Sequence, residues 1–107
     1  MKLWERLRGK EFKYVLDHSR KYFGRFIVVF VSEGVHKKVG FIASKKVGKA
    51  VERNRAKRLM REAFLKFESS LPDDKSYVII AKKGIAKAKV WDVLEDLKNI
   101  LSRSVRK

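Results

Sequence analysis

The side chains best suited to bind a ligand are the cations between positions 45 and 61. On a helical projection, Asn54, Arg58 and Arg61 fall on one side, at positions i, i+4 and i+7. Arginine suits phosphate because its planar guanidinium bonds two oxygens at once, and asparagine adds a donor and an acceptor that can reach a base edge. This spacing predicts a helix face that binds nucleic acid.

Further cations flank this row and fill a short loop before it. The loop leads into the predicted start of the helix, where free backbone amides also attract anions. The predicted nucleic-acid-binding residues are Lys45, Lys46, Lys49, Arg53, Asn54, Arg55, Lys57, Arg58 and Arg61. An ordinary solvent-exposed face usually mixes acids with bases, whereas only Glu52 and Glu62 interrupt this set. Charge density by itself does not separate RNA from DNA.

The sequence contains no arrangement of side chains that predicts bond-breaking chemistry. It has no paired carboxylates, no nucleophile motif, no glycine-rich phosphate loop and no cluster of metal ligands. His18 and His36 stand apart from each other and from any serine or acid pattern. No catalytic residue is therefore predicted, and the groups that would bind a metal are left open.

Composition also points to a polyanionic partner. The chain of 107 residues carries 28 lysines and arginines against 12 acids, which gives a formal net charge of +16. This excess raises self-repulsion in the folded state, and binding to nucleic acid would relieve it. The chain has no cysteine, and its longest apolar run, residues 26–31, is too short to cross a membrane. No signal peptide is visible, so we expect one cytoplasmic domain, residues 1–107, with no membrane partner.

The elements that must position these cations follow from hydrophobic periodicity. Helices are predicted at 10–19, 50–68 and 89–103, and strands at 26–31, 39–43 and 77–81. The first two strands are expected to pair as a hairpin across a turn at Glu33-Gly34. The order α-β-β-α-β-α predicts an α+β or α/β sandwich, with helices packed on a small sheet.

Two of these helices carry a clear apolar side. In the basic helix the apolar stripe is Ala56, Leu59, Met60, Ala63, Phe64 and Phe67. It lies opposite the row of Asn54, Arg58 and Arg61, so the helix is expected to bury one side and expose the cations. In the last helix, Trp91 is expected to pack rather than to stack on a base.

At the basic helix the sequence resembles a known family. Arg53-Asn54-Arg55, together with the flanking residues from Ser44 to Phe64, closely resembles the RNR signature of the bacterial ribonuclease P protein family. Weaker similarity lies at residues 10–12, 39–41 and 77–81. The resemblance implies an α+β fold of order α-β-β-β-α-β-α, a two-layer sandwich with a small mixed sheet. It implies one further short strand, which we expect at or just after residues 43–46, and a left-handed crossover through the RNR helix.

The resemblance also implies a function and its partners. The family's protein works with ribonuclease P RNA, which cleaves precursor tRNA to free the mature 5′ end, with Mg²⁺ bound mainly by the RNA. The chain would then be part of an endoribonuclease whose chemistry is carried by RNA, and the cations at positions 45–61 match the family's RNA-contacting motif. No obligate protein partner is evident.

A cleft between the first helix and the sheet holds the single-stranded 5′ leader of the substrate in this family. Phe12 matches the cleft aromatic on the first helix. Leu16 stands where some relatives have a second aromatic, and our alignment puts Val29 where they have a strand tyrosine. The predicted leader cleft is therefore Phe12, Leu16 and Val29, with less base stacking and more backbone charge and apolar contact.

Three other functions are compatible with a small basic α+β chain. A ribosomal protein would share the charge and the core without needing a leader cleft. A protein-only nuclease would need carboxylates that the sequence does not group together. A DNA-binding protein could insert the basic helix into a major groove.

Overall fold

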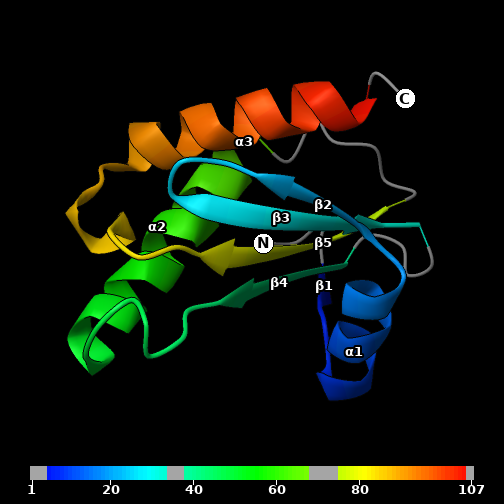
Figure 1. Ribbon diagram of the computed structural model, residues 1–107, viewed down its shortest axis with the longest axis horizontal. Helices are drawn as coiled ribbons and strands as arrows, with labels where there is room; N and C mark the ends of the chain where they lie inside the picture. The colour runs from blue at the N-terminus through cyan, green and yellow to red at the C-terminus, as the bar shows by residue number, and fades with distance from the viewer. Residues whose placement is uncertain (1–4, 34–37, 68–74, 106–107) are drawn as a thin grey trace.

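The computed structural model describes residues 5–33, 38–67 and 75–105, arranged as one mixed sheet with helices on its two faces (Figure 1). In chain order the elements are β1 (Glu5–Arg6), α1 (Gly9–Asp17), β2 (Arg20–Phe23), β3 (Ile27–Ser32), β4 (Lys38–Ile42), α2 (Ala50–Phe67), β5 (Ser76–Ala81), a 3₁₀ turn η2 (Ile85–Lys87) and α3 (Val90–Val105). No helix within these described ranges is long and apolar enough to cross a membrane.

The sheet has the order β1-β4-β5-β3-β2. β4 and β5 run parallel, whereas β3 pairs antiparallel with both β5 and β2. The α+β class, the mixed sheet and the order α-β-β-β-α-β-α after the two-residue β1 are thus confirmed. α2 connects the adjacent parallel strands β4 and β5, as the resemblance implied, and the left-handed sense of that crossover stays a prediction.

The expected hairpin between the first two long strands was wrong. β3 and β4 do not form a hairpin, because β5 lies between them and Ile79 pairs with Val29 on one side and Phe41 on the other. The proposed turn at Glu33-Gly34 falls partly outside the described residues. The true hairpin is β2–β3, whose turn is closed by the Gly24 N–H donating to the Ile27 carbonyl at 2.8 Å.

The extra strand also lies elsewhere than expected. It is β2, directly after α1, whereas the chain after residue 43 forms a turn instead. That turn is closed by the Val47 N–H donating to the Ser44 carbonyl at 3.0 Å. β2 has only four residues, and all but Tyr22 are exposed, so it shows no clear hydrophobic period.

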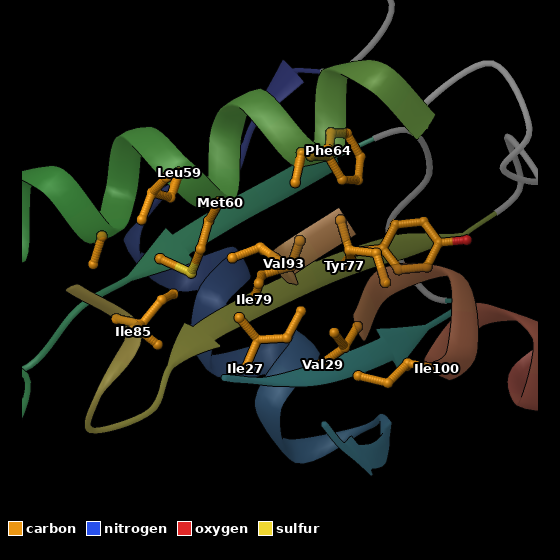
Figure 2. Packing of buried hydrophobic residues seen from close by; sticks show 14 of the residues in the cluster. Ile27, Val29, Leu59, Met60, Phe64, Tyr77, Ile79, Ile85, Val93 and Ile100 are labelled. Carbon is orange, nitrogen blue, oxygen red and sulfur yellow. The ribbon is translucent and has the colours of Figure 1, made fainter. Parts of the chain in front are cut away.

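The main core lies between the sheet and the pair α2 and α3. Figure 2 shows Met60 and Phe64 of α2 pointing toward Ile27 and Ile79 of the strands, with Val93 of α3 beside them. The predicted stripe of α2 is confirmed: all its members are buried except Phe67, which is partly buried against the same core. Each large side chain buried in this way contributes about 1.5–3 kcal/mol.

α1 packs on the opposite face of the sheet, over a smaller cluster. Val15 is fully buried there together with Leu7 and Val78. Phe12 and Leu16 are partly buried against the same cluster. The two-layer core of sheet and α2–α3 therefore gains a partial third layer, and the strand residues facing α1 are not those facing α2.

An ion pair ties the first turn of α1 to the start of β4. Glu11 accepts a hydrogen bond from the Lys38 ammonium and a second one from the Arg8 backbone N–H at 2.8 Å. These two bonds, the Lys38 contact first, lower the pKa of Glu11 below its ordinary value. The carboxylate is therefore favoured by folding.

We predict that this pair makes stability depend on pH in the acidic range. Because the folded pKa is depressed, the stabilisation is complete above about pH 4.3, the usual glutamate pKa, and is lost as pH falls through the folded value. Glu11→Gln should unfold at lower urea concentration at pH 7 and show a shallower loss of stability below pH 4. Glu33→Gln, which alters the more exposed Lys75 pair, is the control and should behave like the wild type. Equal acid slopes for the wild type and Glu11→Gln would contradict the assignment.

Candidate nucleic-acid interface

The outer side of α2 and the loop before it carry the predicted cations. Of the nine predicted residues, six are exposed to solvent: Lys45, Lys46, Lys49, Asn54, Lys57 and Arg58. The other three, Arg53, Arg55 and Arg61, are partly buried. Because the apolar stripe of α2 is fixed against the sheet, the opposite side of the helix must face solvent. The structure thus brings all nine onto one helix and its leading loop.

The loop before α2 is held in a defined shape. Val47 is buried in the main core, so the lysines on either side of it are presented at the surface. Gly48 has φ +144, and a Cβ there would lie 2.3 Å from a carboxylate oxygen of Glu52. Glu52 accepts a hydrogen bond from the Lys49 backbone N–H at 2.7 Å. This acid therefore caps the start of α2.

Two arginines of the RNR sequence are also structural. The Arg53 guanidinium donates to the Gly48 carbonyl at 3.1 Å. Arg55 donates from Nε to the Ala86 carbonyl at 2.8 Å and from Nη2 to the Ala88 carbonyl at 3.2 Å. Sequence reasoning treated both as ligand-binding side chains. The structure shows that each also fixes a neighbouring piece of backbone, in the loop before α2 and in the segment before α3.

A second candidate surface lies on the α1 side of the sheet. The Phe12 ring rests on Gly40 of β4, where an added Cβ would lie 2.3 Å from the ring atoms Cε1 and Cζ. Leu16 is partly buried in the same cluster. These two members of the predicted cleft do lie together, next to a strand whose glycine leaves room for the aromatic ring.

The prediction that Val29 lines the cleft was wrong. It is fully buried in the main core under α2 and α3, on the face opposite to Phe12. Because side chains alternate along a strand, its neighbour Phe30 faces α1 instead. The Lys21 ammonium lies 5.3 Å from the Phe30 ring centroid, a cation–π distance. The alternation along β3, visible in the sequence, could have identified Phe30 as the residue facing away from Ile27 and Val29. Phe26 lies before the strand and packs on the main core.

A hollow connects this face to the basic loop. It is lined by Ser44 and Lys46 of the loop and by Ile80, Ala81, Lys82 and Lys83 at the end of β5. Lys82 donates to the Gly24 carbonyl at 2.9 Å, while Lys83 is exposed. Sequence reasoning missed these two lysines. The signal that could have found them is their position, because both directly follow β5. That strand runs parallel to β4, which leads into the basic loop.

The described residues do not assemble a site for covalent chemistry or for a resident metal. Within residues 5–33, 38–67 and 75–105, no three histidines, cysteines or acids lie close enough to hold a metal ion. Asp96 is buried and accepts the backbone N–H groups of Arg25 and Phe26 at 3.1 and 2.6 Å. His18 stacks on Tyr14, with ring centroids 4.2 Å apart, and His36 lies outside the described residues.

Comparison with known proteins matches nearly the whole chain. The family model described as Ribonuclease P matches residues 1–105. A ribonuclease P protein component from Nitratiruptor sp. is 36% identical over 98 residues, which cover 92% of this chain and 89% of the relative. The one from Exiguobacterium sp. strain AT1b is 40% identical over 100 residues, covering 91% of this chain and 86% of the relative.

Solved structures agree in fold. The RNase P protein from Thermotoga maritima superimposes with a TM-score of 0.78 at 29% identity, covering 92% of this chain and 96% of the other. The RNase P protein from Staphylococcus aureus gives 0.76 at 25% identity, with 92% and 94% covered.

We predict that Gly40→Ala destabilises the protein through Phe12. The new methyl group would overlap the ring, and overpacking of this kind costs about 1–3 kcal/mol. Urea unfolding measures it, with Gly9→Ala as the matched control because no atom lies within 4 Å of a Cβ at that glycine. If both variants unfold alike, Phe12 does not rest on Gly40.

Proposed function

The chain belongs to the ribonuclease P protein family, and from that premise we propose that it binds the catalytic RNA of ribonuclease P and the 5′ leader of precursor tRNA. Family membership connects the chain to the tRNA-processing nuclease complex. It favours this function over a ribosomal or DNA-binding one. We further propose which surface of the protein binds each RNA, and which component of the complex carries out the hydrolysis.

The observation that carries the proposal is the outer side of α2. Its exposed cations stand on a helix whose other side is locked into the core, and its leading loop is held by the cap between Lys49 and Glu52. Cations fixed in this way pay less entropy on binding than those on a mobile tail. On an RNA backbone they would contact phosphates and release the counterions bound there. We assign the catalytic RNA to this surface.

We assign the leader to the α1 side of the sheet. Phe12, Leu16 and Phe30 offer partly exposed apolar surface there, and Lys46 and Lys83 border the adjoining hollow. A single strand suits this combination, because bases contact apolar and aromatic groups while the backbone follows the cations. The two RNAs would then lie on different faces of the molecule, with the basic loop between them.

We propose that the protein breaks no bond itself. The phosphodiester hydrolysis would belong to the RNA, and the Mg²⁺ it needs would be held mainly by RNA. The protein's part is to screen the repulsion between two polyanions and to hold the leader in place. The complex would work in the cytoplasm.

We predict that Arg58→Ala weakens binding to ribonuclease P RNA and flattens its salt dependence. Loss of one phosphate contact removes about one counterion or less, so the slope of log K against log salt should fall by roughly one unit or less. Filter binding across a salt series measures both quantities. Lys13→Ala, which removes an exposed cation from α1, is the control for net charge. Unchanged affinity and slope for Arg58→Ala would remove this residue from the interface.

We also predict that the purified protein leaves precursor tRNA intact, even at high Mg²⁺. Added to ribonuclease P RNA, it should lower the Mg²⁺ concentration needed for correct 5′ maturation, because its cations replace part of the screening. Gel analysis of end-labelled precursor follows both reactions. Mature 5′ ends from RNA-free protein would overturn the division of labour and favour a protein-only nuclease.

A further inference from the structure

Trp91 lies at the surface although the sequence predicted that it packs. Its side chain is 64% exposed, in the first turn of α3. Burial of α3 centres on Val93 and Leu97, and Trp91 projects on the opposite side of the helix. Aromatic side chains of this size usually bury most of their area. An indole that is exposed to solvent in the first turn of a helix is therefore a candidate contact for a planar ligand.

The backbone that carries Trp91 is fixed to α2. Arg55 donates to the carbonyls of both Ala86 and Ala88, and Ala88 is itself buried. The start of α3 is then closed by the Lys89 backbone N–H, which donates to the Asp92 carboxylate at 2.9 Å. Trp91 thus follows directly after a segment that α2 holds by hydrogen bonds, so its position is set by the RNR helix.

The two helices that carry Trp91 and the α2 cations cover the same face of the sheet. α2 and α3 pack against each other on one face of the sheet, and α1 covers the other (Figure 1). Both the exposed side of α2 and the exposed side of α3 point away from the sheet. A polyanion lying along α2 can therefore continue over the first turn of α3 without crossing to the α1 side.

The charges around Trp91 favour a nucleic acid over a second copy of the chain. Lys87 and Lys89 are both exposed and precede it directly. Asp92 is occupied by the cap, and Glu95 lies one turn further along α3, so phosphates are expected on the lysine side. A second copy would bring another net charge of +16 to the same surface.

From these observations we propose that Trp91 stacks on an unpaired base of the RNA bound by α2, with Lys87 and Lys89 on the adjoining phosphates. Arg55 then acts as a positioning residue, which holds the Trp91 segment at the edge of the RNA surface. The inference rests on the proposed binding of ribonuclease P RNA and extends that surface from α2 to α3. Stacking suits an exposed indole because every base has a π-face, whatever its sequence.

Binding of ribonuclease P RNA to three variants tests the proposal. Trp91→Ala should weaken binding roughly 5- to 150-fold, the range for loss of one stacked base. The salt slope should not change, because no cation is removed. Trp91→Phe should recover most of the affinity. Tyr14→Ala, which removes an exposed aromatic from α1, is the matched control and should bind like the wild type.

Fluorescence gives a readout that a merely structural role would not move. The chain has two tryptophans, so Trp4→Phe leaves Trp91 as the only tryptophan, and excitation at wavelengths that tyrosine does not absorb isolates its emission. Saturating ribonuclease P RNA should quench this emission and protect it from acrylamide, and precursor tRNA alone should do so less. Stronger quenching by precursor tRNA would overturn the assignment to the catalytic RNA.

The remaining outcomes separate this inference from the function on which it rests. If the wild type binds the RNA and matures tRNA with it, while Trp91→Ala binds equally well and Trp91 emission is unchanged, the stacking site is wrong and the proposed function stands. If Trp91 becomes protected with rising protein concentration and no RNA, the occupant is a second copy. If the wild type does not bind ribonuclease P RNA, both proposals fail.

Discussion

Burial of one side of α2 against the sheet is the interaction on which the rest of the structure depends. Met60 and Phe64 anchor the helix in the main core, where the Phe64 ring contacts Phe41 of β4 and Tyr77 of β5, the two strands that the helix connects. The cations make no comparable apolar contact, so their direction is imposed by the opposite side of the helix. The same packing fixes α3, and with it the surface that we propose as an extension of the RNA interface.

A chain with a formal charge of +16 must also fold against its own repulsion. Part of the solution is that several cations are bonded to the protein. Arg53 and Arg55 donate to backbone carbonyls, Lys82 does the same, and Lys38 pairs with Glu11. The two arginines and Lys82 satisfy carbonyls at loops and turns while keeping their charge. Arg53 and Arg55, which we propose as part of the RNA-binding surface, therefore also brace the loop before α2 and the segment before α3.

Prediction from sequence worked where the signal is local. The basic helix was expected at 50–68 and is Ala50–Phe67, with its buried and exposed sides as expected. It failed where distant segments compete. No residue near the first two long strands indicates that β5 lies between them, so the prediction of their pairing was wrong. For Val29, a shift of one residue in the alignment moved the side chain to the opposite face of the sheet, because strand side chains alternate. The prediction that Trp91 packs was wrong because its apolar character was taken as evidence of burial.

The residue pattern alone established the class of fold, the charge, the basic helix and, through the family resemblance, the expected partner. These depend on composition and on helical or strand period, which neighbouring residues define. Tertiary structure decided the strand order, the placement of Phe30 rather than Val29 on the α1 face, and the exposure of Trp91 after a segment that Arg55 braces. These features depend on tertiary structure because they arise from contacts between segments far apart in the chain. A local sequence pattern does not indicate which distant segments come into contact.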